Sequence, residues 1–221
     1  MFNVAIDGPA GAGKSTIAKM VAKKLGFTYV DTGSMYRAMA LACLREGLKA
    51  SDEAEVCKVC ENLDVSLEYD ENGAQQVILN GENVNAYIRT EEVGNMTSAI
   101  AVYGPVREKL VELQRKLGTK YDVIMDGRDI GTCVLKDAPV KIYLTASSRT
   151  RAERRYKELT EKGVDCNLDD IEKDIIDRDY RDMNREISPL KQADDAILVD
   201  SSNMGIEEVV NELVRIIEEA R

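Results

Sequence analysis

Short apolar runs alternate along the chain with segments whose apolar residues recur at helical spacing. The runs predict five buried strands at residues 3–6, 27–30, 121–126, 140–144 and 196–199. After a first helix that ends at Gly26, the periodic segments predict helices at residues 34–46, 52–63, 91–102, 104–118, 147–162, 168–185 and 206–220. Strands that alternate with helices are typical of an α/β fold, here a five-stranded parallel sheet with helices on both faces.

One segment departs from this alternation and predicts a local antiparallel sheet. Residues 65–69 and 76–79 read as strands, and each is followed by an Asn-Gly turn, at 72–73 and 80–81. We therefore expect one domain over residues 1–221, with a small β insertion at residues 64–100.

Composition narrows the class of protein. The chain has 221 residues, of which 44% are hydrophobic and 32% charged, as in ordinary globular proteins. No apolar run is long enough to span a bilayer, and the first residues carry no basic region, so we expect no signal peptide and a cytoplasmic location. A net charge of −10 argues against general binding to nucleic acid or to an anionic membrane.

The histidine and cysteine content argues against two further classes of site, the histidine-dependent catalytic triad and the zinc site. There is no histidine, which removes the histidine-dependent hydrolase triads. Five cysteines, an odd number, are typical of reduced thiols. Cys57 and Cys60 have C-x-x-C spacing, but they lie within a helix-like run and no second pair or histidine would complete a zinc site.

The strongest motif is a phosphate-binding loop. Residues 8–15 fit G-x-x-x-x-G-K-[ST] between a strand and a helix, which is the context this motif requires. The glycines let backbone N–H groups turn toward phosphate oxygens, Lys14 reaches the β- and γ-phosphates, and the Ser15 hydroxyl binds Mg²⁺. The expected ATP-binding residues are Gly8, Pro9, Ala10, Gly11, Ala12, Gly13, Lys14, Ser15 and Thr16.

Arginines near the ends of other strands indicate a second anionic substrate. Tyr36 and Arg37 fall in the first turn of their predicted helix, and Arg128 and Asp129 follow the third core strand. Ligands of open α/β sheets lie beyond the carboxyl ends of the strands. Arg178, Asp182 and Arg185 have i, i+4 and i+7 spacing, which predicts that they share one helix face. An alternative for these three is a solvated run of ion pairs.

A loop of this kind occurs in switch GTPases, motor ATPases and kinases. No asparagine is followed by lysine, so the guanine-reading N-K-x-D motif is absent. A second arginine cluster suits a phosphate-bearing acceptor because guanidinium groups bind phosphate bidentately. The helical segment 147–165, with Arg151 and Arg155, is suited to closing as a lid over the transferred phosphoryl group. A kinase is therefore the favoured interpretation, with Lys14, Arg128, Arg151 and Arg155 as catalytic candidates.

Over its full length the chain resembles the bacterial cytidylate kinases, a family of nucleoside monophosphate kinases. The resemblance is carried by residues 7–15, 31–37, 106–108, 126–132, 137–142, 151–155 and 178–185. It implies a monophosphate-binding insertion, a short lid, and transfer of the γ-phosphoryl group of ATP to CMP or dCMP with Mg²⁺.

Carried over position by position, the resemblance implies a set of acceptor contacts. Arg37 and Arg128 hold the acceptor phosphate, and Asp182, braced by Arg178, meets the ribose hydroxyls. The full expected set is Thr32, Tyr36, Arg37, Ser98, Arg107, Arg128, Asp129, Arg178, Asp182 and Arg185. Thr32 stands where the family often has serine, and Ala10 replaces a common serine of the loop.

The placing of Asp129 near cytosine has a physical interpretation. A carboxylate accepts from the N4 amino group, as in base recognition, whereas uracil presents a carbonyl there. An unpaired polar contact costs about 1–3 kcal/mol, so discrimination of roughly ten- to a hundredfold is expected. The residues alone leave open a kinase for UMP or a non-nucleotide alcohol, and a nucleotide-dependent switch. We expect a monomer, although the sequence does not fix the oligomeric state.

Overall fold

The structure, a computed structural model, describes residues 1–221, which form two compact units. The first unit comprises residues 1–29 and 122–221, and the second comprises residues 30–121. The chain leaves the first unit within β2 (Thr28–Asp31) and returns just before β6 (Val123–Gly127). Each unit has its own hydrophobic core.

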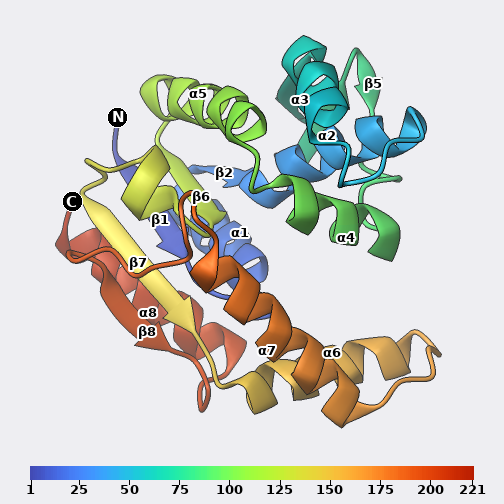
Figure 1. Cartoon of the computed structure of the whole chain (residues 1–221). Helices are drawn as coiled ribbons and strands as arrows, with labels where there is room; N and C mark the ends of the chain where they lie inside the picture. The colour runs from blue at the N-terminus through green and yellow to red at the C-terminus, as the bar shows by residue number, and fades with distance from the viewer. The chain divides into compact units, whose positions relative to one another are not determined.

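The first unit is built on the predicted parallel sheet, with strand order β2-β6-β1-β7-β8 (Figure 1). Its other elements are β1 (Asn3–Asp7), α1 (Lys14–Leu25), a π-helical turn η1 (Ile130–Val134), β7 (Val140–Thr145), α6 (Ser148–Glu161), α7 (Leu168–Asn184), β8 (Ile197–Asp200) and α8 (Ile206–Glu219). The central strand β1 pairs in parallel with β6 and β7, and its last residue, Asp7, is level with Gly127 and Tyr143. The carboxyl ends of these three strands therefore share one edge.

The core of this unit is an apolar layer that α1 and α8 build against the strands. Val21 of α1 and Leu213 of α8 are fully buried, as are Ile124 of β6 and Leu144 of β7. Burying such a side chain contributes about 1.5–3 kcal/mol. Apolar residues at helical spacing thus fix where α1 starts, and with it the loop that precedes it.

Helices α6 and α7 differ from the others because few of their residues are buried. They pack side by side (Figure 1). In α6 only Arg151 and Ala152 are buried, and in α7 only Asp179. This pair is thus held by polar contacts as well as by apolar ones.

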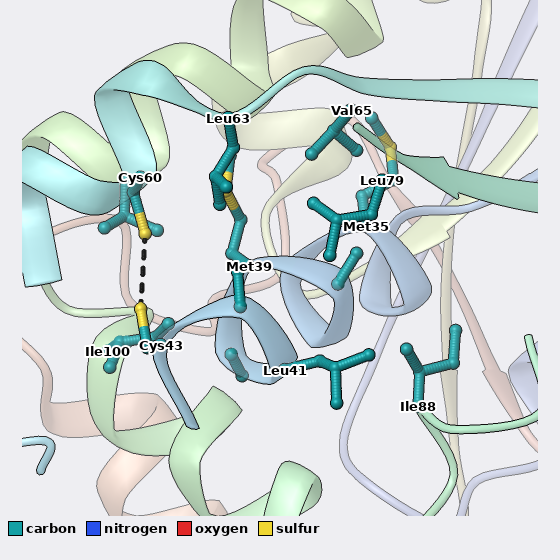
Figure 2. Packing of buried hydrophobic residues seen from close by; sticks show 14 of the residues in the cluster. Met35, Met39, Leu41, Cys43, Cys60, Leu63, Val65, Leu79, Ile88 and Ile100 are labelled. Atoms are coloured by element: carbon teal, nitrogen blue, oxygen red, sulfur yellow. Dashed lines mark hydrogen bonds between the residues drawn. The ribbon is translucent and has the colours of Figure 1, made fainter. Parts of the chain in front are cut away.

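The second unit contains the separate antiparallel sheet, with strand order β3-β4-β5. Its elements are α2 (Thr32–Arg45), α3 (Glu53–Asn62), β3 (Val65–Tyr69), β4 (Gln75–Leu79), β5 (Glu82–Asn83), α4 (Glu91–Ile100) and α5 (Gly104–Lys120). The core of this unit is built by α2, α3, α4, α5 and this sheet, and it includes Met35 and Met39 of α2 (Figure 2).

Within that core the Sγ atoms of Cys43 and Cys60 lie 3.7 Å apart, as a thiol–thiol hydrogen bond (Figure 2). Both cysteines are fully buried. This contact raises the pKa of Cys60 and lowers that of Cys43. The contact of Cys60 is thus with a cysteine of another helix and not with Cys57, its C-x-x-C neighbour.

The two sheets confirm the predicted fold class, with local differences. The short strand β5 and the turn η1 were not predicted. Helix α2 starts at Thr32, with Asp31 as its N-cap, so the placing of Tyr36 and Arg37 in its first turn was wrong; they lie in the second. Helix α7 ends at Asn184, and Arg185 has extended backbone angles, so the prediction of one helix face for residues 178–185 was wrong for Arg185. None of the helices is long and apolar enough to cross a membrane.

Candidate active site

The phosphate-binding loop joins the central strand β1 to α1, as the motif predicts. Gly8 has φ 150°, and a Cβ there would lie 2.0 Å from the carbonyl oxygen of Leu144, so no other residue fits. Gly13, with φ 85°, is the N-cap of α1 and uses the left-handed region that glycine tolerates. The first N–H groups of α1 have no partners within the helix, so they are available to an anion.

Lys14 begins α1 and is buried. Its Nζ donates to the carbonyl oxygen of Pro9 at 2.7 Å. Burial and then the charge of Arg128 lower the pKa of Lys14 well below its ordinary value of 10.5, and Asp126, Asp7 and Asp182 oppose that shift. A phosphate in the loop would favour the charged amine, because an opposite charge nearby raises the pKa of a lysine.

Ser15 and Asp126 form an oxygen-donor pair beside Lys14. Ser15 Oγ donates to Asp126 Oδ2 at 2.9 Å, and the Tyr29 hydroxyl donates to Asp126 Oδ1 at 2.8 Å. A hydroxyl and a carboxylate are the hard oxygen ligands that Mg²⁺ prefers. The residues therefore fit a magnesium ion, and Asp126 joins Ser15 as a candidate.

Asp7 ties the loop strand to the segment after β6. Its carboxylate accepts the backbone N–H groups of Ile130 and Gly131, at 2.8 and 2.7 Å, which are the first groups of the turn η1. Burial nevertheless raises the pKa of Asp7 from 3.8 to about 6, with the two N–H bonds opposing it. Asp7 thus positions the start of η1, next to Arg128 and Asp129.

Two ion pairs connect the end of β6 to α7 and the residue that follows it. Arg128 Nε donates to Asp182 Oδ2 at 2.9 Å, and Arg185 Nη2 lies 3.8 Å from Asp129 Oδ1. Asp182 therefore pairs with Arg128. The bracing of Asp182 by Arg178, which the resemblance implied, stays a prediction. The two ion pairs bring together four residues for which the resemblance implied acceptor contacts.

The two catalytic candidates of α6 have different surroundings. Arg155 is half-exposed, and its Nη1 donates to Glu158 at 2.8 Å. Lys162 and then Arg155 lower the pKa of Glu158. Arg151 is buried and donates to Ala146, Ala10 and Asp179. Contact of either arginine with a phosphoryl group stays a prediction.

Apart from Arg178, which lies in α7, the other predicted acceptor residues belong to the second unit. Arg37 Nη1 donates to the Ile88 carbonyl at 3.2 Å, and a Cβ on Gly94 would lie 3.4 Å from that Nη1 atom. Ser98 Oγ donates to the Gly94 carbonyl at 3.3 Å. Glycine at position 94 thus lets Arg37 lie against α4 close to Ser98.

Tyr36 and Arg107 make a second contact in this unit. The guanidinium carbon of Arg107 lies 5.7 Å from the centre of the Tyr36 ring, a cation–π distance, and Arg107 Nη1 donates to the Ala101 carbonyl at 3.2 Å. Thr32, the first residue of α2, is buried.

A polar network at the start of α2 was not predicted from the sequence. The carboxylate of Asp31 accepts from the Ser34 N–H and from Arg89, and Gln75 of β4 bonds the Asp31 backbone and the Ser34 hydroxyl. An aspartate directly before a helical segment is an N-cap signal. Nothing local in the sequence marks Gln75, which is 44 residues away from Asp31.

The sheet and the loop after its central strand define a P-loop nucleotide-binding protein. A family model described as cytidylate kinase matches residues 4–219. The chain is 52% identical to a cytidylate kinase of Clostridium acetobutylicum, over 98% of this chain and 97% of that one. It is 49% identical to a cytidylate kinase of Lactobacillus johnsonii, over 99% of this chain and 94% of that one. The chain belongs to the cytidylate kinase family.

A solved structure of an uncharacterized protein from Eubacterium ventriosum has a similar fold, with a TM-score of 0.54. The two chains are 11% identical, and the comparison covers 99% of each. At this identity the likeness concerns the fold alone.

The environment of Asp7 predicts a pH dependence of stability. Burial raises the pKa of Asp7 to about 6. Its contribution to the stability of the fold is therefore fully present below about pH 3.8 and is lost as pH rises through about 6. The free energy of unfolding, measured without nucleotide, should fall for the wild type relative to Asp7→Asn between pH 4 and 7, by up to about 3 kcal/mol.

Denaturant unfolding across this pH range measures that difference. The exposed Asp177 provides the control, and Asp177→Asn should keep a constant offset from the wild type. A constant offset for Asp7→Asn as well would mean that the two backbone N–H groups keep Asp7 ionised throughout, contrary to this account.

Proposed function

We propose that this protein transfers the γ-phosphoryl group of ATP to CMP or dCMP, giving ADP and CDP or dCDP. The observation that carries the proposal is the group of charged side chains at one edge of the sheet. The loop with Lys14 lies there beside Arg128, and Arg128 and Asp129 are paired with Asp182 and Arg185. The family's relatives named cytidylate kinase support CMP as the acceptor.

Phosphoryl transfer needs positioning and charge neutralisation more than a general base, so the absence of histidine is no obstacle. We propose that residues 8–16 bind ATP, with backbone N–H groups and Lys14 on its phosphates. Lys14 would then leave the Pro9 carbonyl for a phosphate oxygen. Arg128, and Arg155 from α6, would neutralise the charge that develops on the transferred group.

Ser15 and Asp126 would hold Mg²⁺, the latter directly or through water. When bound, the ion neutralises charge on the phosphate oxygens. Ser15 and Asp126 bond one another, which keeps both oxygen donors in place beside the loop.

We propose that the acceptor makes the contacts that the resemblance implies. Arg37 and Arg128 bind its phosphate, and Asp182 and Arg178 bind its ribose. Ser98, Arg107, Asp129 and Arg185 surround the cytosine, while Thr32 and Tyr36 complete the contacts. Asp129 accepts from the N4 amino group, and Arg185, which is its ion-pair partner, directs its carboxylate.

We further propose that the protein acts in the cytoplasm, as a monomer and without a nucleic-acid partner. Its net charge of −10 and its reduced cysteines support this proposal.

Lys14→Ala should lower kcat for CMP-dependent ADP formation by about 10³-fold or more, because the transferred charge loses its buried cation. Coupled-assay initial rates measure this loss. Lys23 lies on the exposed side of the same helix, so Lys23→Ala should keep near-normal rates. Near-normal turnover in Lys14→Ala would contradict the assignment of the loop.

Asp129→Ala should lower kcat/KM for CMP by about ten- to a hundredfold and leave the KM for ATP within a fewfold of the wild type. The reason is that the cytosine amino group loses its acceptor while the ATP loop is untouched. Steady-state kinetics with each substrate varied in turn give the two values. Equal losses for both substrates would make Asp129 a structural residue.

A further inference from the structure

The few buried residues of the α6–α7 pair include an ion pair. Arg151 Nη2 donates to Asp179 Oδ2 at 2.6 Å, and the two side chains are 6% and 12% exposed. The second oxygen of Asp179, Oδ1, is buried and accepts no hydrogen bond. The carboxylate of Asp179 thus accepts its hydrogen bond from Arg151. Without that partner, the buried carboxylate would destabilise the fold.

The other nitrogens of Arg151 bind backbone near the phosphate-binding loop. Nη1 donates to the carbonyl oxygen of Ala10 at 2.8 Å, within the loop, and Nε donates to the carbonyl oxygen of Ala146 at 2.9 Å. The stem of Arg151 also lies against the loop, since a Cβ on Gly11 would be 3.4 Å from its own Cβ. One guanidinium therefore joins α7, the loop and the end of β7.

The bond to Ala10 has a consequence for the next residue. A trans peptide is planar, so the Ala10 carbonyl and the Gly11 N–H point in opposite directions. Holding the carbonyl on the side of Arg151 turns the Gly11 N–H to the other side of the loop. Arg151 thus orients one of the donors that we assign to ATP.

The same turn of α7 also carries residues that we assign to the acceptor. Arg178 precedes Asp179 directly, and Asp182 follows it by three residues and pairs with Arg128. Two ion pairs therefore fix this turn of the helix, one leading to the ATP loop and one to the end of β6.

We propose that Asp179 is a positioning residue that acts through Arg151: it holds the guanidinium that orients the Ala10–Gly11 peptide of the ATP loop, and it couples the loop to the acceptor-binding turn of α7. The inference rests on the proposed function for the identity of the two ligands. It predicts that a residue of α7 which touches neither ligand changes the affinity for ATP.

The test is Asp179→Asn, with ATP affinity measured by calorimetry in the absence of an acceptor. The dissociation constant should rise about tenfold, because Arg151 loses the charge that fixes it. The KM for CMP should rise severalfold as the turn at residues 178–182 shifts. Hydrogen–deuterium exchange of the nucleotide-free protein should be faster in the loop, residues 8–13.

The matched control is Asp177→Asn, on the exposed side of the same helix, which should leave all three values unchanged. The double variant Asp179→Asn with Arg151→Gln should bind ATP no more weakly than Arg151→Gln alone, because the two residues form one link. Additive losses would mean that the residues act separately, and would overturn the proposal.

A second variant covers the case in which Asp179→Asn does not fold. Arg151→Lys keeps the buried charge pair but lacks the fork that reaches both Asp179 and Ala10. It should remain folded, with the same faster exchange in the loop and weaker ATP binding. Unchanged loop exchange in the folded variants would overturn the inference while leaving the kinase proposal intact. Wild-type protein that binds ATP without transferring phosphoryl to CMP would instead overturn the proposed function alone.

Discussion

The site depends on the pairing of cations with carboxylates where water is largely excluded. Burial and then the charge of Arg128 lower the pKa of Lys14. The carboxylates of Asp126, Asp7 and Asp182 oppose that shift. A chain with a net charge of −10 can bind triphosphate and monophosphate only if its cations are concentrated locally. The carboxylates keep these cations at one edge of the sheet, and the anionic ligands would neutralise the positive charge that the carboxylates leave.

The fold supplies this edge through ordinary packing. Apolar residues of α1 and α8 fix the helices against the parallel strands, so the loop after β1, the segment after β6 and the end of β7 lie level. Polar contacts then set the details: Asp7 holds the start of η1, and Arg151 holds the loop. The second unit packs around a separate core and presents Arg37 and Ser98 on adjoining helices, α2 and α4.

The sequence allowed the prediction of all five core strands and of the loop, because periodicity and glycine motifs are local signals. The turn η1 could not be predicted in this way, because its wide turn is set by the Asp7 carboxylate, which lies 123 residues before Ile130. The ion pair between Arg128 and Asp182, and the contact of Arg151 with Ala10, also depend on tertiary geometry. Helix spacing misplaced Arg185 because the pattern of charges continues beyond the last helical turn.

The central proposal is that the charged edge selects a cytosine nucleoside monophosphate, CMP or dCMP, as acceptor. Initial rates of ADP formation from ATP and Mg²⁺ test it most directly, with CMP, dCMP, UMP, AMP, GMP or no acceptor. The account predicts fast turnover with CMP and dCMP, and rates at least about tenfold lower with UMP, whose carbonyl would face Asp129 without a proton between them. ADP formation that is independent of the acceptor, or equal rates for all acceptors, would contradict it.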